Sequence, residues 1–190
     1  MKRLGLVLAF VATSAWAGPA ALELEGVSFP ATAQVGGQLL QLNGAGVRKR
    51  AFFKVYAAGL YVPEKASSAA ALLAQQGPRL VTMTMLRDVD GDRMSEAVTD
   101  GLKANHSEAQ LAGFATQIAT LEANLKAIGE ARKGDVIHFE FTPQTGTRIV
   151  VNGQQKGRAI PGNPFFTAVL RNWIGDEPVD AGLKQTLLGR

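Results

Sequence analysis

The stretch AFFKVYAAGLYV, residues 51–62, is apolar at almost every position, and Lys54 is its one charged residue. Successive side chains of a β-strand point to opposite faces of the sheet. A strand that is apolar on both faces is therefore expected to be covered on both sides. Period-two alternation predicts further strands over residues 22–30 and 79–86, and another is expected over residues 38–47. The N-terminal part of the chain thus predicts a largely buried sheet.

The middle of the chain is predicted to be helical. Met94, Val98 and Leu102 recur at four-residue spacing, which places them on one face of a helix. Asp90 or Asp92 can cap the start of this helix, because a carboxylate accepts hydrogen bonds from the first free backbone N–H groups.

A stronger helical pattern begins at Ser107, which forms a capping-box signature with Gln110. Apolar residues then recur at spacings of three and four: Leu111, Phe114, Ile118, Leu121, Leu125 and Ile128. One amphipathic helix laid on a sheet is the expected structure, and a short coiled coil is the alternative.

Two more strands are predicted over residues 135–143 and 147–160, with Asn152-Gly153 as the strongest hairpin signal of the chain. After them, Asn163 as a cap and Pro164 at the first helical position indicate another helix. That helix is expected to stop at Gly175, and a last short helix should follow. The order of strands, helices, strands and helices predicts an α+β domain with a mostly antiparallel sheet.

Residues 1–17 have the pattern of a cleavable signal peptide: Lys2 and Arg3, a short apolar run, and a small-x-small ending. The apolar run is shorter than the roughly 20 residues that a membrane span needs, which argues against an anchor. Cleavage is therefore expected before Gly18. The prediction is an exported, periplasmic protein whose mature part, residues 18–190, is one domain with no membrane span.

Composition excludes several functional classes. The chain has no cysteine, which rules out disulfides, zinc–thiolate sites and thiol catalysis. Its net charge is +4 and falls to +2 once Lys2 and Arg3 are removed. Such a balance gives no concentrated basic stripe, so nucleic acid is not an expected partner.

No metal or cofactor is expected from the titratable residues. Neither His106 nor His138 has a second histidine nearby in the sequence. Asp88, Asp90 and Asp92 lack the glycine and the bidentate glutamate of a calcium loop. A capped loop that leads into a helix explains these aspartates better.

Arg48 and Tyr56 are the candidates for a ligand site. Residues 26–63 contain no Asp or Glu, so the cations in this region must find their counter-charge elsewhere. If the chain between Arg48 and Tyr56 were one extended strand, both side chains would share a face. A guanidinium and a phenol together can hold a carboxylate or a polarised carbonyl oxygen. The alternative is that residues 48–50 form a solvated turn and that Tyr56 belongs to the core.

Four segments resemble the bacterial chalcone isomerase-like proteins. They are GVSFP, LNGAGVRKRAFFKVYAAGLYVPEKA, DGDRMSEAVTDGL and KGRAIPGNPFFTAVLRNWIGDEPVDAGLKQTLLG. The resemblance covers residues 22–189 in matching order. It implies a large antiparallel sheet backed by a layer of helices, with a pocket between them. The family has two functional branches: plant chalcone isomerases close a flavanone ring without a cofactor, and the related plastid fatty-acid-binding proteins hold a fatty acid in the same cleft.

The resemblance assigns roles to individual residues. Arg48 corresponds to the family arginine, which stabilises an oxyanion in the isomerases and pairs with the carboxylate in the fatty-acid binders. Tyr56 corresponds to a position that is threonine in the isomerases and tyrosine in the binders. Met94 and Gly101 stand where the isomerases have tyrosine and asparagine, and Asn172 stands at their serine or threonine position. The chain therefore keeps the arginine and departs from the isomerases elsewhere.

The residues and the resemblance together favour a non-catalytic periplasmic binding protein for a fatty acid or similar hydrophobic carboxylate. A carboxylate amphiphile needs one anion anchor and an apolar slot. The predicted ligand-binding residues are Arg48, Tyr56, Met94, Phe114, Asn172 and Trp173. The alternative is a cofactor-free intramolecular lyase of the chalcone isomerase type, and a third possibility is a structural partner of an envelope system.

Overall fold

The computed structural model describes residues 21–190. The predicted signal peptide and its cleavage site lie outside these residues. Within the described part of the chain, no helix is both long enough and apolar enough to cross a membrane.

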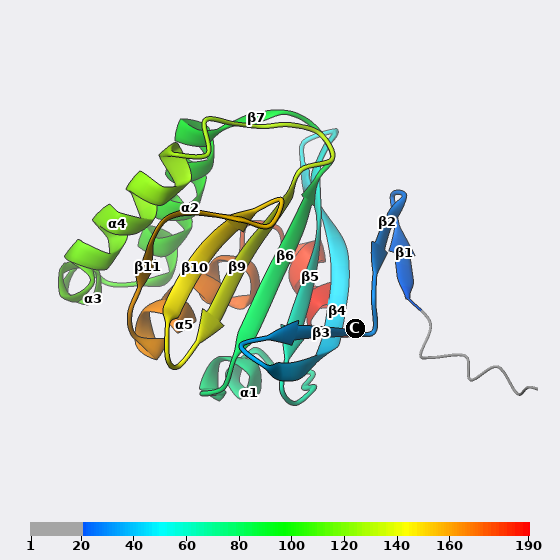
Figure 1. The fold of residues 1–190 in the computed structure, drawn as a ribbon, viewed down its shortest axis with the longest axis horizontal. Coiled ribbons are helices and arrows are strands. Elements are labelled where there is room, and N and C mark those ends of the chain that lie inside the picture. Colours follow the sequence, from blue (N-terminus) through cyan, green and yellow to red (C-terminus); the bar gives the residue numbers. More distant parts are fainter. Residues whose placement is uncertain (1–20) are drawn as a thin grey trace, which may run out of the picture.

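An antiparallel sheet of seven strands forms the centre of the fold, in the order β11-β10-β9-β6-β5-β4-β3 (Figure 1). Two small two-stranded pairs, β1–β2 and β7–β8, lie outside it. The strands are β1 (Leu22–Leu24), β2 (Val27–Phe29), β3 (Thr32–Val35), β4 (Gln38–Arg50), β5 (Phe53–Val62), β6 (Arg79–Met85), β7 (Val89–Asp90), β8 (Glu130–Ala131), β9 (Val136–Thr142), β10 (Gly146–Val151) and β11 (Gln154–Ile160).

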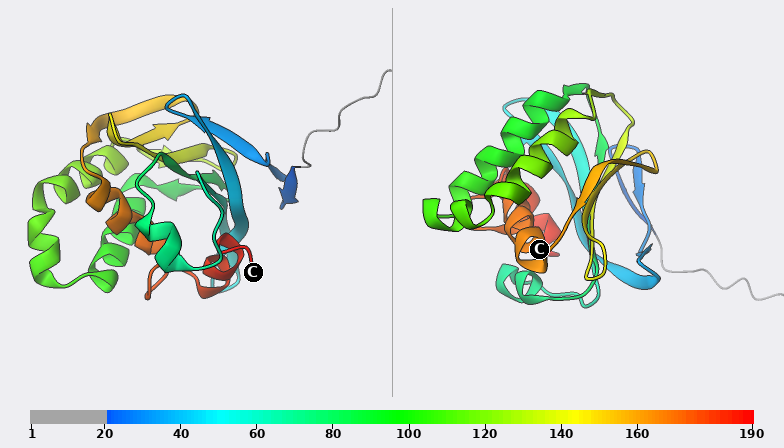
Figure 2. Two further views of the ribbon diagram at one scale, coloured as in Figure 1. Left: turned by 90° about the horizontal axis from the view of Figure 1, so that it is seen from below. Right: turned by 60° about the vertical axis from the view of Figure 1, so that its left-hand side comes forward.

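The long helices cover one face of the curled sheet, and the β1–β2 hairpin lies on the other (Figures 1 and 2). The α2 helix packs against α4 and α5, while α6 packs against β4 and α1 against α5. The helices are α1 (Ala69–Ala74), α2 (Gly91–Asn105), α3 (Glu108–Gly113), α4 (Ala115–Lys126), α5 (Asn163–Ile174) and α6 (Ala181–Leu187). This arrangement confirms the predicted α+β class.

Strand β5 is buried on both faces, as its sequence predicted. Tyr56 and Ala58 point into the main core beneath the helices. Ala57 lies on the opposite face, where it packs with Phe29 of β2. A Cβ atom at Gly59 would lie 2.7 Å from the Phe29 ring, so only glycine allows β2 to approach so closely.

The prediction of one half-buried strand over residues 22–30 was wrong. The chain reverses at Glu25 and Gly26, whose φ angles are 53° and 76°, and the segment forms the β1–β2 hairpin. Glycine adopts positive φ without strain, which places a turn where alternation alone predicts a continuous strand.

The single helix predicted after Ser107 is two helices. The capping box of Ser107 and Gln110 is present, but α3 ends at Gly113 and α4 starts after Phe114. Phe114 has φ −110° and ψ 11°, outside the helical region, and its ring packs edge-on against Phe165 at 5.6 Å. The chain changes direction at Phe114, where the partly buried ring packs against the main core. No coiled coil forms, because α4 packs against α2 and β11 instead.

Asn163 does not cap α5 but is its first residue, one position before the predicted start at Pro164, while the helix ends before Gly175 as predicted. Its side-chain oxygen accepts a hydrogen bond from Arg79, and its amide donates to Gln76 at 2.7 Å. The residue before it, Gly162, is the N-cap and makes no side-chain cap bond. Asn163 therefore bonds to residues that are distant in the sequence, and the local sequence does not indicate these contacts.

Candidate functional site

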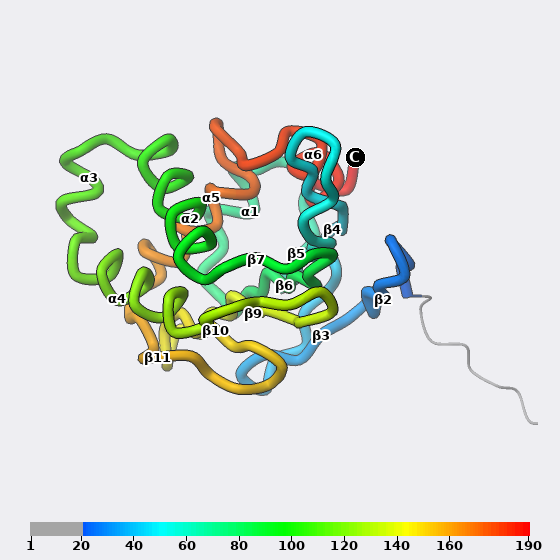
Figure 3. Tube along the Cα trace, turned by 90° about the horizontal axis from the view of Figure 1, so that it is seen from above, coloured from blue at the N-terminus to red at the C-terminus, as the bar shows by residue number. Residues whose placement is uncertain are grey.

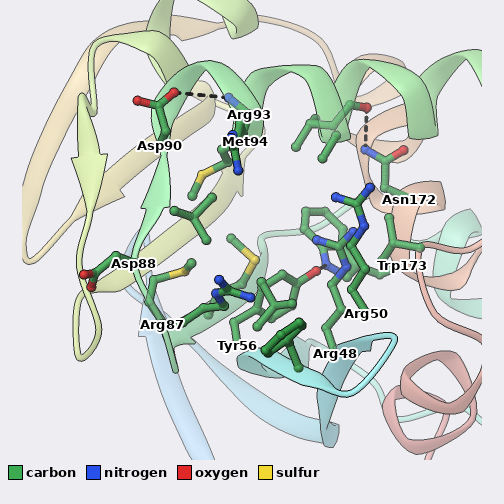
Figure 4. A pocket seen from close by; sticks show the side chains of 18 of the residues that line it. Arg48, Arg50, Tyr56, Arg87, Asp88, Asp90, Arg93, Met94, Asn172 and Trp173 are labelled. Atoms are coloured by element: carbon green, nitrogen blue, oxygen red, sulfur yellow. Dashed lines mark hydrogen bonds between the residues drawn. The ribbon is translucent and has the colours of Figure 1, made fainter.

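A cavity of about 590 Å³ lies between the sheet and the helices, at the end where the β4–β5 turn, β7 and the start of α2 meet (Figure 4). This volume falls within the range of small-molecule sites. Arginines and aspartates frame one part of the cavity, and methionines and other apolar residues line the rest. The lining residues are Arg48, Arg50, Ala51, Phe53, Val55, Tyr56, Met83, Met85, Arg87, Asp88, Val89, Asp90, Arg93, Met94, Ala97, Val98, Asn172, Trp173 and Val179.

Arg48 and Tyr56 share a face of the sheet, but on two adjacent strands. The chain turns at residues 51–52, and Arg48 of β4 is the direct cross-strand partner of Tyr56 of β5. The assumption of one extended strand between them was therefore wrong, while the predicted proximity holds. The guanidinium carbon of Arg48 lies 5.6 Å from the centroid of the Tyr56 ring.

Arg48 has no carboxylate within salt-bridge distance among residues 21–190. Its Nε is buried and has no hydrogen-bond partner in this part of the chain. Lys54 of the same acid-poor region does find a carboxylate, Glu25, at 2.7 Å. Lys49 and Arg50 are exposed to water. Of the cations in the acid-free stretch, Arg48 is therefore the one with a buried donor and no partner among the described residues. Such a donor is costly, because it has lost its hydrogen bonds to water.

Tyr56 is held by Trp173 of α5. The indole Nε1–H donates a hydrogen bond of 2.9 Å to the Tyr56 hydroxyl oxygen, and both residues are buried. The hydroxyl proton itself has no acceptor among the described residues. Burial raises the pKa of Tyr56, the positive charge of Arg48 and the Trp173 hydrogen bond oppose that rise without cancelling it, and the charge of Asp180 adds to it. The phenol is therefore neutral at physiological pH and has a proton to donate.

The apolar wall of the cavity is rich in methionine. Met83 and Met85 of β6 and Met94 of α2 line it, and these are the only methionines after Met1. Met85 is the cross-strand partner of Tyr56. Unbranched, polarisable methionine side chains adapt to flexible apolar ligands. The prediction that Met94 lines the cavity wall agrees with this placement.

Asn172 lines the cavity and also ties α5 to α2. Its amide donates to the Val98 carbonyl at 3.1 Å, while its Oδ1 is buried without a partner among the described residues. A Cβ atom at Gly101 would lie 2.4 Å from that oxygen, so the glycine lets the two helices approach. Gly101 and Asn172 therefore serve the packing of α5 against α2.

The structure places five of the six predicted ligand-binding residues around one cavity. Phe114 is the exception, because it lies between α3 and α4 against Phe165 and does not line the cavity. The helical spacing of Phe114 predicted that its side chain packs against the protein, but it did not indicate against which part. Phe114 is therefore not among the proposed ligand contacts.

The rim of the cavity includes charged residues that the sequence reasoning missed. Arg50 is the last residue of β4, next to the β4–β5 turn, and Arg87 and Arg93 flank β7. Asp90 caps α2 by accepting hydrogen bonds from the N–H groups of Asp92 and Arg93, as predicted for one of the two candidate aspartates. The β4–β5 turn and the loop around β7 come together only in the folded protein, so the sequence did not indicate that their charges share one rim. The cluster of cations from residue 48 onward did indicate a charged surface.

Comparison with known proteins identifies the family. A model of the chalcone isomerase-like family matches residues 21–189, and the chain therefore belongs to that family. Among solved structures, a fatty-acid-binding protein of Arabidopsis thaliana superimposes with a TM-score of 0.66 at 16% sequence identity. The match covers 88% of this chain and 95% of the plant protein, and it shows that the two share a fold. No curated protein sequence matched the chain.

Proposed function

We propose that this protein is a non-catalytic carrier that binds a fatty acid or a similar hydrophobic carboxylate in the cavity between sheet and helices. One observation carries the proposal. Trp173 donates to the oxygen of Tyr56, which leaves the hydroxyl proton free beside the unpartnered Nε of Arg48. Two unused donors side by side match the two oxygens of a carboxylate.

The rest of the cavity supports an acyl chain. Its methionine wall suits a flexible apolar body, and its volume of about 590 Å³ accommodates a small molecule. The shared fold with a protein described as fatty-acid-binding points in the same direction. Because burial keeps Tyr56 protonated, its phenol is suited to donating a hydrogen bond and poorly suited to abstracting a proton.

Export to the periplasm is part of the same proposal and rests on the signal-peptide pattern of residues 1–17. Expression in a bacterial host followed by fractionation should place the protein in the periplasm. The mass of the recovered chain should correspond to a start at Gly18. Recovery of the uncleaved chain from the cytoplasm would contradict export without affecting the ligand proposal.

The binding function can be tested directly. Purified protein, extracted and examined by mass spectrometry, should release a carboxylate amphiphile. Dodecanoate and dodecanol have the same alkyl chain and differ in the carboxylate. Calorimetry with both ligands therefore separates the contribution of the carboxylate contacts from that of the apolar wall. We expect dodecanoate to bind at least tenfold more tightly. An empty extract together with no dodecanoate binding would refute the proposal, and measurable cyclisation of a chalcone would favour a lyase.

A further inference from the structure

The β4–β5 turn carries exposed aromatic residues at the rim of the cavity. Phe52 is 100% exposed and Phe53 is 59% exposed. Phe52 does not line the cavity, so the proposed ligand site does not account for it. Seen from above, the turn and the start of α2 lie toward opposite ends of the stretch that contains β7 (Figure 3). The turn thus presents an apolar tip next to the opening.

The arginines at the cavity rim next to this turn lack ion-pair partners in the described part of the chain. Arg87 stacks over the Phe53 ring at 4.8 Å, which joins the β4–β5 turn to the loop before β7. Among residues 21–190, Arg50, Arg87 and Arg93 have no carboxylate within salt-bridge distance. The nearby Asp88 accepts a hydrogen bond of 2.8 Å from the Lys133 backbone N–H. The cavity rim beside the exposed Phe52 therefore carries three arginines without ion-pair partners within residues 21–190, against the two aspartates Asp88 and Asp90.

We propose that this rim docks on an anionic lipid surface, with Phe52 inserted at the interface and the three arginines on lipid phosphates. Exposed aromatic residues flanked by cations are typical of segments that lie in a membrane interface. Arginine binds phosphate through a planar fork of donors. Charge complementarity thus selects anionic lipid as the occupant. Docking would hold the cavity mouth against the bilayer, so that an amphiphile could pass between the two; only this transfer step rests on the proposed function.

Vesicle co-sedimentation tests the docking. The processed protein is mixed with vesicles of phosphatidylglycerol and phosphatidylcholine in equal parts, or of phosphatidylcholine alone. We expect binding to the anionic vesicles, weakened by salt. Phe52→Ser should lower the partition coefficient about tenfold, from lost apolar burial. Arg50→Gln and Arg87→Gln should each lower it about fivefold.

Matched control variants come from surfaces remote from the rim. Leu39 is 63% exposed and lies at the opposite end of β4, about 35 Å along the strand. Arg158 is an exposed arginine of β11, at the other edge of the sheet. Leu39→Ser and Arg158→Gln should leave vesicle binding unchanged. All variants have the same N-terminal sequence ahead of residue 21, so differences between them cannot come from that segment.

Three results would overturn the proposal. Equal binding to anionic and neutral vesicles would remove the role of charge. Loss of binding in Leu39→Ser as large as in Phe52→Ser would remove the role of the turn. If vesicles do not bind and Phe52→Ser instead dissociates an oligomer, the turn is an interface between copies of the chain. Dodecanoate titration of the same samples reports separately on the ligand site, so docking can stand where the proposed function fails.

Discussion

Arg48 and Arg79 are both arginines that lack a carboxylate partner within residues 21–190, yet the fold uses them in different ways. Arg79 is fully buried, and its guanidinium lies 5.1 Å and 4.8 Å from the rings of Phe141 and Phe166. It also donates to Asn163, and to the Gly77 carbonyl at 3.2 Å. Burial lowers its pKa to about 10, so it is still charged at neutral pH.

Arg48 differs in having donors that the described chain does not use. It lines a cavity, and its buried Nε has no hydrogen-bond partner. A missing carboxylate is thus a weak sign of a ligand site, because aromatic rings and neutral oxygens can satisfy a buried guanidinium, as they do for Arg79. The informative sign is an unused donor that faces a cavity. Arg48 meets that criterion and Arg79 does not.

Replacement of Arg48 should have the largest effect, and it should fall on ligand affinity. Arg48→Met removes a charge-assisted contact, which is worth about 2–5 kcal/mol when the other partner stays buried. We expect dodecanoate affinity, measured by calorimetry, to fall by that amount, and dodecanol binding to change little. The free energy of unfolding in urea should stay within about 1 kcal/mol of the parent, because no hydrogen bond to Nε is lost. A large loss of stability with unchanged dodecanoate affinity would show that Arg48 is a structural residue like Arg79 and not a ligand contact.

Replacement of Arg79 should produce the opposite pattern and serves as the matched control. Arg79→Met removes the donor to Asn163 and to the Gly77 carbonyl and leaves two partly buried acceptors without that partner, which costs about 1–3 kcal/mol. We expect the free energy of unfolding to fall by that amount and dodecanoate affinity to remain at the parent value. Weaker dodecanoate binding in a folded Arg79→Met variant would show that the two arginines are not independent.

Much of this comparison could be predicted from the sequence, because it depends on local patterns. The acid-free stretch drew attention to Arg48, and the nearly unbroken apolar run over residues 51–62 placed Tyr56 in a strand covered on both faces. Asn152-Gly153 does form the β10–β11 hairpin, with φ angles of 49° and 80° that suit its turn. Each of these signals acts within a few residues of the chain.

The remaining parts of the site depend on contacts between distant segments. Trp173 reaches Tyr56 across 117 residues of sequence, and nothing local indicates that its N–H fixes the direction of the phenol. The register that sets Met85 opposite Tyr56 depends on how β5 and β6 pair. Arg79 itself was not recognised, because its ring partners come from β9 and α5.

The two tyrosines extend the comparison and give the smallest expected effect. Tyr61 donates to the Pro30 carbonyl at 2.9 Å, and burial raises its pKa to about 12. The pKa of Tyr56 is also raised, chiefly by burial. The folded protein then binds more protons than the unfolded chain above about pH 10, so stability should be level below that pH and fall above it. Either Tyr→Phe variant should reduce this alkaline loss in urea unfolding.

Dodecanoate affinity separates the two tyrosines where alkaline stability does not. Tyr56→Phe removes the free hydroxyl proton and should weaken binding by about 1 kcal/mol, whereas Tyr61→Phe should leave it unchanged because that hydroxyl is already bonded to Pro30. In the parent protein the affinity should be level from pH 7 to about pH 9.5, since burial raises the pKa of Tyr56 and keeps its phenol neutral over that range. Calorimetry at both ends of that range measures it. A steep loss of affinity within the range, abolished by Tyr56→Phe, would mean that the phenol ionises there and does not serve as the second donor.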